Sequence, residues 1–265
     1  MLLHLAVAVE QVVVATNTFL AKSNSALQAL RSTTLLKSLP VNALITGEAG
    51  TGKKTLARSV FSNTPIIHAS NFDEILHSLY ECEDIIITAF EAISNYDTLQ
   101  KALEESKTRL IAITSVSLPQ KVYDQFFTTK IKLLPLRERH EDVMLLCEKF
   151  LRENGDLVGG HDKSICQSKH LNLEQNAHSL KRSIIMQSLF SSLEKREIMQ
   201  LFEEYLESKI EGENAYRDNL EIFDIPIINV GMRKYKSQLQ LAKVLGLNRN
   251  TLRKKIVQYE KELDI

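Results

Sequence analysis

The chain has 265 residues, with 33 basic and 33 acidic side chains, so bulk charge excludes a generally basic nucleic-acid binder and a strongly acidic protein. Its length allows a substantial core and two or three small domains. The cysteines Cys82, Cys147 and Cys166 include no C-x-x-C pair and predict no disulfide framework. A metal site formed by His161, Cys166 and His170 fits no standard zinc spacing, so we predict a solvated loop there and no metal site.

The chain begins with an apolar stretch, residues 1–9, which Glu10 interrupts. The stretch is too short to span a bilayer and has no basic segment before it, so it predicts a buried strand rather than a signal peptide. We therefore expect a cytoplasmic protein without a membrane contact. The next element, residues 23–38, has apolar residues at helical spacing and starts at Ser23, which can cap a helix.

A glycine loop, residues 47–54, follows the apolar run 43–46 and precedes a helical run, 55–61. Strand, glycine loop, lysine and helix predict a P-loop, because the loop amides and the helix N-terminus surround a polyphosphate and Lys53 reaches its outer phosphates. We therefore expect ATP or ADP to bind. Magnesium binding is doubtful, because Lys54 occupies the position where Ser or Thr normally holds the ion. The expected contacts are Gly47, Glu48, Ala49, Gly50, Thr51, Gly52, Lys53, Lys54 and Thr55.

Helices and strands alternate up to Pro135. The predicted helices are 72–79 and 98–106, and the predicted strands are 84–89, 109–114 and 130–134. Because the strands are rich in Ile, the pattern predicts an α/β core with a parallel sheet covered on both faces. After Pro135 the strands stop, and helices are predicted over 141–153 and 176–190. The polar, glycine-bearing stretch 154–170 between them predicts a mobile loop.

Residues 193–210 form a strongly amphipathic segment. Its apolar face contains Ile198, Leu201, Phe202, Tyr205 and Leu206. Such a stripe is equally typical of a helix that packs in the core and of a helix that forms a dimer, and both interpretations stay open.

The last part of the chain is basic. From Val230 onward nine basic residues stand against three acidic ones, an excess of six. A short helix over 237–245, the turn residue Gly246 and a second helix over 249–259 predict a helix-turn-helix. Its small core would contain Leu241, Ala242, Leu245, Leu247, Leu252 and Ile256. The expected DNA contacts are Asn248, Arg249, Asn250, Thr251, Arg253, Lys254 and Lys255, and the alternative is a solvated basic helix.

Four segments, in family order, resemble the NtrC-like bacterial enhancer-binding proteins, the AAA+ activators of sigma-54 RNA polymerase. They are the P-loop GEAGTGKK with the following Leu-Ala-Arg, the segment PLRERHEDV at 135–143, the stretch 21–30, and the Fis-type helix-turn-helix at 245–255. The resemblance implies an AAA+ P-loop core over 1–136, a helical lid over 137–192, and a dimerisation helix with an all-α DNA-binding domain over 193–265. It also implies double-stranded DNA with a palindromic site, a homodimer, and contact with a full-length activator or RNA polymerase.

The chain departs from this family at several functional positions. Matching the Walker B strand to 85–91 places Phe90 at the metal-binding Asp and Glu91 at the Glu. Residues 124–127 (DQFF) occupy the place of the family's arginine fingers. Ser115 or Ser117 occupies the place of the sensor Asn, and His178 occupies the place of the sensor Arg in the lid. No GAFTGA loop is present. An arginine finger is worth about 10³–10⁵ in rate, so these losses predict binding without efficient hydrolysis.

The expected function is therefore that of a sequence-specific DNA-binding transcription regulator that holds ATP or ADP. No catalytic residue is expected, and Glu91 is the one candidate if the chain hydrolyses ATP. Lys54 is a candidate to replace the charge of magnesium. Three alternatives stay open: an active AAA+ ATPase that activates transcription, a nucleotide-sensing co-regulator without a specific DNA site, and a structural P-loop fold with an empty site.

Overall fold

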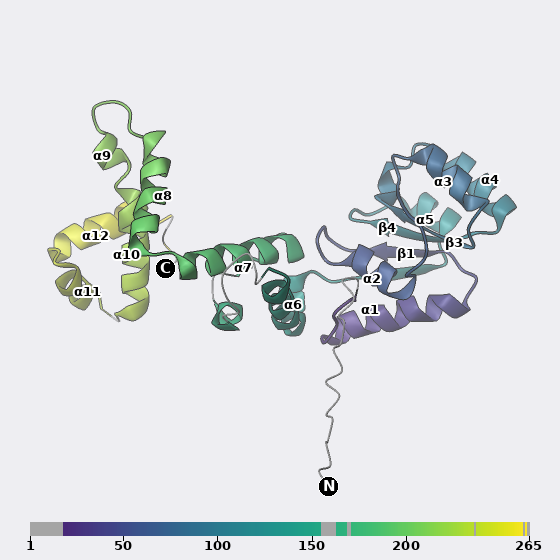
Figure 1. Cartoon of the computed structure of the whole chain (residues 1–265), viewed down its shortest axis with the longest axis horizontal. Helices are drawn as coiled ribbons and strands as arrows, with labels where there is room; N and C mark the ends of the chain where they lie inside the picture. The colour runs from purple at the N-terminus through teal and green to yellow at the C-terminus, as the bar shows by residue number, and fades with distance from the viewer. Residues whose placement is uncertain (1–17, 155–162, 169–170, 236, 262, 264–265) are drawn as a thin grey trace, which may run out of the picture. The chain divides into compact units, whose positions relative to one another are not determined.

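A computed structural model describes residues 18–154, 163–168, 171–235, 237–261 and 263. The chain divides into two compact units between Ser192 and Leu193. The predicted strand at 1–9 and the residues His161 and His170 lie outside the described residues. Figure 1 shows the α/β part of the first unit and the all-helical second unit.

Five parallel strands form one sheet in the first unit, in the order β2-β3-β4-β1-β5. The strands are β1 (Ala43–Thr46), β2 (Ile66–His68), β3 (Asp84–Thr88), β4 (Arg109–Thr114) and β5 (Thr129–Lys132). β1 lies between β4 and β5, with Ile45 opposite Ile113 on one side and Ile131 on the other. The loop that follows β1 therefore leaves from inside the sheet, at its carboxyl edge, where ligands bind in open α/β sheets.

Helices cover both faces of this sheet, as the sequence predicts. One face packs against α1 (Asn24–Leu35) and α2 (Lys53–Val60), and the other against α3 (Phe72–Leu79), α4 (Tyr96–Ser106) and α5 (Gln120–Phe126) (Figure 1). On β3, Ile86 faces the first group while Ile85 and Ile87 face the second, and all three are fully buried. Burial of each such side chain contributes about 1.5–3 kcal/mol. The short strand β2 and helix α5 are not among the elements that the sequence predicts.

A helical lid completes the first unit. It contains η3 (Leu136–Glu138), α6 (His140–Asn154), η4 (Lys163–Gln167) and α7 (Ala177–Ser192). η4 lies within the stretch predicted as a mobile loop, so that prediction is wrong at 163–167. The cysteine pattern predicts no disulfide framework, but the structure contains one disulfide, between Cys147 on α6 and Cys166 on η4. Their pairing depends on how these two elements pack over Leu136 and Leu180, which the cysteine spacing does not reveal.

The second unit contains α8 (Lys195–Glu207), α9 (Ala215–Asp218), α10 (Glu221–Lys234), α11 (Gln238–Leu245) and α12 (Arg249–Gln258). Its core contains the apolar residues predicted to pack between α11 and α12, and it adds residues of α10. The cluster contains Ile228, Leu241, Ala242, Leu252, Tyr259 and Leu263, with Leu245, Leu247 and Ile256 packed against it. The sequence pattern does not predict α10, because Pro226 lies inside it and a proline normally interrupts a helix.

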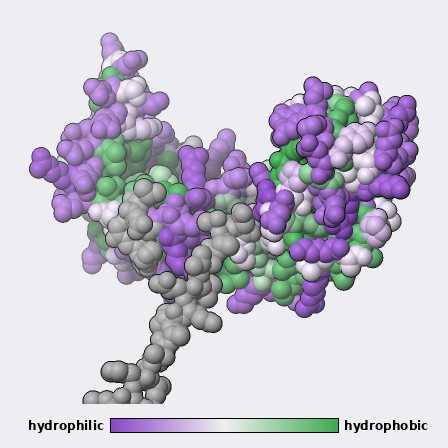
Figure 2. Space-filling model, turned by 45° about the vertical axis from the view of Figure 1, so that its right-hand side comes forward, coloured by the Kyte–Doolittle hydropathy of each residue, from purple (hydrophilic) through white to green (hydrophobic). Residues whose placement is uncertain are grey.

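The apolar face of α8 is exposed. Its large exposed side chains are Ile198, Met199, Leu201, Phe202 and Tyr205, and no residue of α8 is buried. Figure 2 shows hydrophobic residues at the surface among hydrophilic ones. Core packing therefore does not account for this stripe within the described residues. None of the helices in the described ranges has the length and apolar composition needed to cross a membrane.

Candidate functional site

The glycine loop connects β1 to the start of α2, where Lys53 is the first helical residue. Gly50 has φ +76°, a conformation that side chains other than glycine rarely adopt. A Cβ at Gly50 would also lie 2.5 Å from the carbonyl oxygen of Gln175 and 2.8 Å from Cδ2 of His178. The loop therefore needs glycine here both for its turn and for the close approach of the lid.

A cavity of about 450 Å³ lies over this loop. Of the nine predicted nucleotide contacts it is lined by six: Ala49, Gly50, Gly52, Lys53, Lys54 and Thr55. Gly47 and Glu48 line a neighbouring cavity of about 500 Å³, and the side chain of the ninth, Thr51, donates to the carbonyl oxygen of Glu48 at 2.9 Å. His178 of the lid lines the same cavity as Lys53, which agrees with the position that the family resemblance gives it.

Lys53 is held under the loop and is only 6% exposed. Its Nζ donates to the carbonyl oxygens of Gly47 and Glu48, both at 2.6 Å, and to Oγ of Ser115 at 3.0 Å. Burial lowers the pKa of Lys53 from its usual value, and the nearby carboxylates of Glu91 and Glu48 oppose this shift. Of the two serines predicted as a sensor residue, Ser115 is therefore the one that reaches the P-loop lysine.

The lid is tied to the loop by Asn176. Its Nδ2 donates to the carbonyl oxygen of Ala49 at 2.9 Å and to Glu48 at 3.2 Å, and its Oδ1 accepts from the backbone N–H of Leu136 at 2.7 Å. Glu48 also forms a bidentate ion pair with Arg137. The Arg137 and Asn176 hydrogen bonds lower the pKa of Glu48 to about 2.

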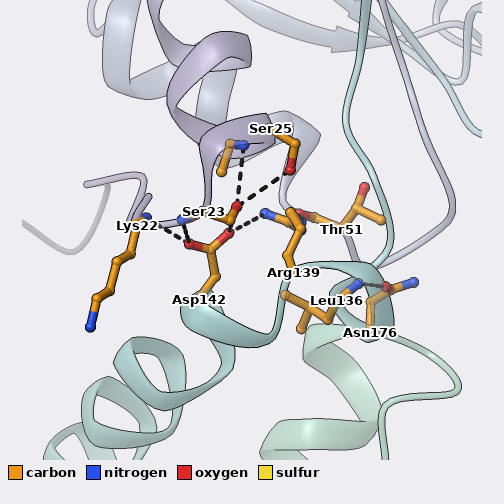
Figure 3. Close-up of polar contacts among 9 residues, drawn as sticks. Lys22, Ser23, Ser25, Thr51, Leu136, Arg139, Asp142 and Asn176 are labelled. Carbon is orange, nitrogen blue, oxygen red and sulfur yellow. Dashed lines mark hydrogen bonds and ion pairs between the residues drawn. The ribbon is translucent and has the colours of Figure 1, made fainter.

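A buried ion pair forms a second connection (Figure 3). Arg139 Nη1 lies 3.3 Å from Oδ2 of Asp142, and Arg139 Nη2 donates to the carbonyl oxygen of Thr51 at 2.8 Å. Asp142 accepts from the backbone N–H groups of Lys22 at 2.6 Å and Ser23 at 2.8 Å, and from Oγ of Ser23 at 2.7 Å. This network joins the start of α1, the P-loop and α6. The family resemblance covers the segments that carry these residues, but the contacts between them do not follow from the sequence.

The end of β3 differs from the sequence-based alignment. Phe90 does not face the cavity: it is fully buried, with its ring centroid 5.6 Å from that of Phe126 and 5.1 Å from that of Phe127. The chain turns at Ala89, which has φ +53°. Thr88 and Ala89 line the cavity instead, together with Glu91. The assignment of Phe90 to the place of a metal-binding Asp is therefore wrong, because its apolar ring fills the core under α4 and α5.

Magnesium is the ion that P-loop sites normally use, and the residues here do not fit it. Magnesium in such sites is held by one or two carboxylates, a hydroxyl and substrate phosphates. Among the described residues that line the cavity, Glu91 is the one carboxylate, and it lies beyond the end of β3. The residue after the P-loop lysine is the cation Lys54, and the hydroxyl of Thr88 donates to Ile67 O at 3.3 Å.

The predicted DNA contacts are the N-cap of α12 and residues of its first two turns. Asn248 caps the helix, accepting from the N–H of Asn250 at 2.9 Å. Arg249, Thr251, Arg253 and Lys254 are exposed. A hollow of about 430 Å³ is lined by Asn250, Arg253, Lys254, Val257 and Gln258.

Lys255 differs from its neighbours on α12. Its ammonium pairs with Asp224 on α10, which also accepts from Tyr259 Oη at 3.2 Å. Asp224 is buried, so the pair holds α12 against α10. The geometry favours a structural role for Lys255.

Comparisons with known proteins identify the fold. No model of a known protein family matches the chain. A limonene hydroxylase from Geobacillus stearothermophilus is 23% identical over 87% of this chain, which spans only about half, 54%, of that protein. The crystal structure of NtrX from Brucella abortus in complex with ADP matches with a TM-score of 0.53 and 15% identity, over 92% of this chain and 69% of NtrX. The structure with ATP matches with a TM-score of 0.51 and 15% identity, over 91% and 68%. The chain therefore has the fold of the AAA+ P-loop ATPases.

Proposed function

We propose that this protein is a sequence-specific DNA-binding transcription regulator whose AAA+ core holds ATP or ADP without efficient hydrolysis. The observation that carries the proposal is the exposed basic face of α12, placed in a helix-turn-helix on the same chain as a P-loop. A P-loop by itself would fit any nucleotide-binding protein, whereas a helix-turn-helix with an exposed basic helix favours a nucleic-acid partner.

The DNA-binding role follows from the chemistry of α12. Gly246 has φ +66° and ends α11, so that α12 begins after a short turn, as in DNA-binding helix-turn-helix units. Arginine can read guanine edges and asparagine adenine edges in the major groove, while lysine meets phosphate. In this assignment Arg249, Asn250 and Arg253 read bases, and Lys254 contacts the backbone.

The nucleotide-binding role rests on the P-loop geometry. The first N–H groups of α2 have no partner within their helix, which makes them donors for a phosphate. Nucleotide complexes of NtrX support this assignment by analogy of fold. Hydrolysis is expected to be inefficient because the stretch 115–136 contains no arginine to act as a finger and the donor set at β3 does not fit magnesium.

A homodimer fits the exposed stripe of α8. A hollow of about 460 Å³, lined by apolar residues that include Phe202, Tyr216 and Phe223, continues this stripe toward α9 and α10. Two copies that joined through it would present two α12 helices, which corresponds to a palindromic DNA site. We also propose that the protein is related to the sigma-54 activators and is located in the cytoplasm. A full-length activator or RNA polymerase is a further proposed partner. The proposed division is a core over 1–136, a lid over 137–192 and a DNA-binding part over 193–265.

The test is selection of bound sequences from a random double-stranded DNA library, using the full chain. The expected result is enrichment of one palindromic motif, with weaker and less specific binding by the Arg253→Ala variant. Lys101→Ala is the matched control, because Lys101 is exposed on α4, far along the chain from the helix-turn-helix. Binding that depends steeply on salt without any preferred sequence would contradict specific recognition.

A further inference from the structure

We propose that the nucleotide site takes ADP or ATP as the metal-free anion, with Lys54 in the role that magnesium has in related sites. This inference rests on the proposed nucleotide binding and adds the form in which the ligand is bound. It follows from the residues that line the cavity, which include two lysines, Lys53 and Lys54, and one carboxylate, Glu91.

The charge of a free nucleotide needs compensation from the protein. Lys53 supplies one positive charge beneath the loop, and the amides at the start of α2 supply the partial positive charge of a helix N-terminus. Lys54 adds a second full charge from the next position of the helix, where its side chain is exposed and lines the cavity. Together these groups can offset the outer phosphates without an added cation.

The electrostatic environment of the same cavity is unfavourable for a magnesium ion. The ammonium of Lys54 would repel a dication that bridges the outer phosphates. At the end of β3 the side chains that face the cavity are those of Thr88 and Ala89, and neither supplies an anion. Glu91 is the remaining carboxylate among the described lining residues, and its charge also acts on Lys53.

The experiment is a titration of the full chain with a fluorescent ADP and a fluorescent ATP, in excess EDTA and in millimolar magnesium. The expected result is that magnesium raises the apparent Kd, and more for ATP than for ADP, because magnesium converts the free nucleotide into a metal complex that the site does not take. Lys54→Ala weakens binding in EDTA by about ten- to a hundredfold, because it removes a charge-assisted hydrogen bond. The control Lys101→Ala leaves both Kd values unchanged.

A second variant tests the converse. Lys54→Thr combined with Thr88→Asp restores a hydroxyl and a carboxylate to the site, so its binding is expected to tighten when magnesium is added. Thermal unfolding shows whether this variant folds, and the wild-type titration decides the question if it does not. A wild-type Kd that is unchanged or lower in magnesium overturns the inference.

The failure of the underlying proposal gives a different result. If neither nucleotide binds in either buffer, the proposal of nucleotide binding is wrong, and so is the inference that the site takes the metal-free form. Lys53→Ala separates the two outcomes, because it is expected to remove binding in both buffers alike. Binding that survives Lys53→Ala places the nucleotide elsewhere and also overturns the inference.

Discussion

Basic side chains have opposite surroundings in the two units. In the first unit Lys53 and Arg139 are 6% and 1% exposed, and both donate to carbonyl oxygens of the P-loop. In the second unit Arg253 and Lys254 are exposed and form no ion pair with any described residue. The first pair therefore holds the P-loop in shape, with Lys53 also lining the nucleotide cavity, whereas the second pair is free to meet an external anion.

The residue next to Lys254 shows why residue type alone does not assign these roles. Lys255 belongs to the same basic run, but it pairs with the buried Asp224. A charge that is desolvated and paired contributes to the packing of helices, and its removal leaves a buried partner without compensation. The difference between basic residues that stabilise the fold and basic residues that are free to bind an external anion can be tested residue by residue.

The largest expected effect is at Asp142. Asp142→Ala removes the carboxylate that pairs with Arg139 and accepts three hydrogen bonds from Lys22 and Ser23. Because Arg139 then remains as a buried, uncompensated charge, the free energy of unfolding should fall by about 3–5 kcal/mol. Urea denaturation measures this loss. The control is Arg137→Ala, which breaks an exposed ion pair with Glu48. An equal loss of unfolding free energy in this control would contradict the larger role of the buried pair.

The disulfide in the lid comes next. Cys147 and Cys166 are 19 residues apart, and a bond that closes a loop of this length contributes about 3 kcal/mol. A reducing agent should therefore lower the thermal unfolding temperature of the first unit. Cys147→Ala with Cys166→Ala should have the same lowered temperature with and without the reducing agent. Cys82→Ala, which removes the free thiol, should leave the effect of the reducing agent intact.

Substitutions on α12 should reduce DNA binding in two different ways. Arg253→Ala should weaken binding to the preferred DNA by about 1–3 kcal/mol and relax specificity, because it removes a base contact. Lys254→Ala should weaken binding to all sequences and reduce the salt slope by about one, because it removes a phosphate contact. Fluorescence anisotropy at several salt concentrations measures both. Lys255→Ala should instead lower the stability of the second unit, and an unchanged stability would count against its structural role.

The smallest expected effect is the pH dependence at Glu48. Its pKa in the folded chain is about 2 and its ordinary value is 4.5, so its contribution to stability is present above pH 4.5 and is lost as the pH falls toward 2. The difference in unfolding temperature between the wild type and Glu48→Gln should therefore be constant above pH 4.5 and shrink below it. A difference that grows on acidification would show that Arg137 does not stabilise the carboxylate.

Much of the fold could be predicted because its signals are local. The run of isoleucines at 85–87 indicates a buried strand, and Ser23, Gly246 and Asn248 mark helix ends that the structure confirms. The P-loop and the helix-turn-helix are also local patterns of spacing. β2, α5 and α10 were missed because they are short or interrupted, as Pro226 interrupts α10.

The contacts that hold the site could not be predicted in the same way. Arg139 and Thr51 are 88 residues apart, and Asn176 and Ala49 are 127 residues apart. No periodicity joins such positions, because their meeting depends on how the lid packs against the core. The same reason explains Phe90, whose place in the core is set by Phe126 and Phe127 rather than by its position after β3.

The most direct test of the central claim is a measurement of phosphate release from ATP by the full chain, with and without its selected DNA, at a concentration where nucleotide binding is saturated. The expected rate is at background and does not differ between the wild type and Lys53→Ala. A measurable rate that Lys53→Ala abolishes would contradict it, because the cavity at the P-loop would then be a working ATPase site.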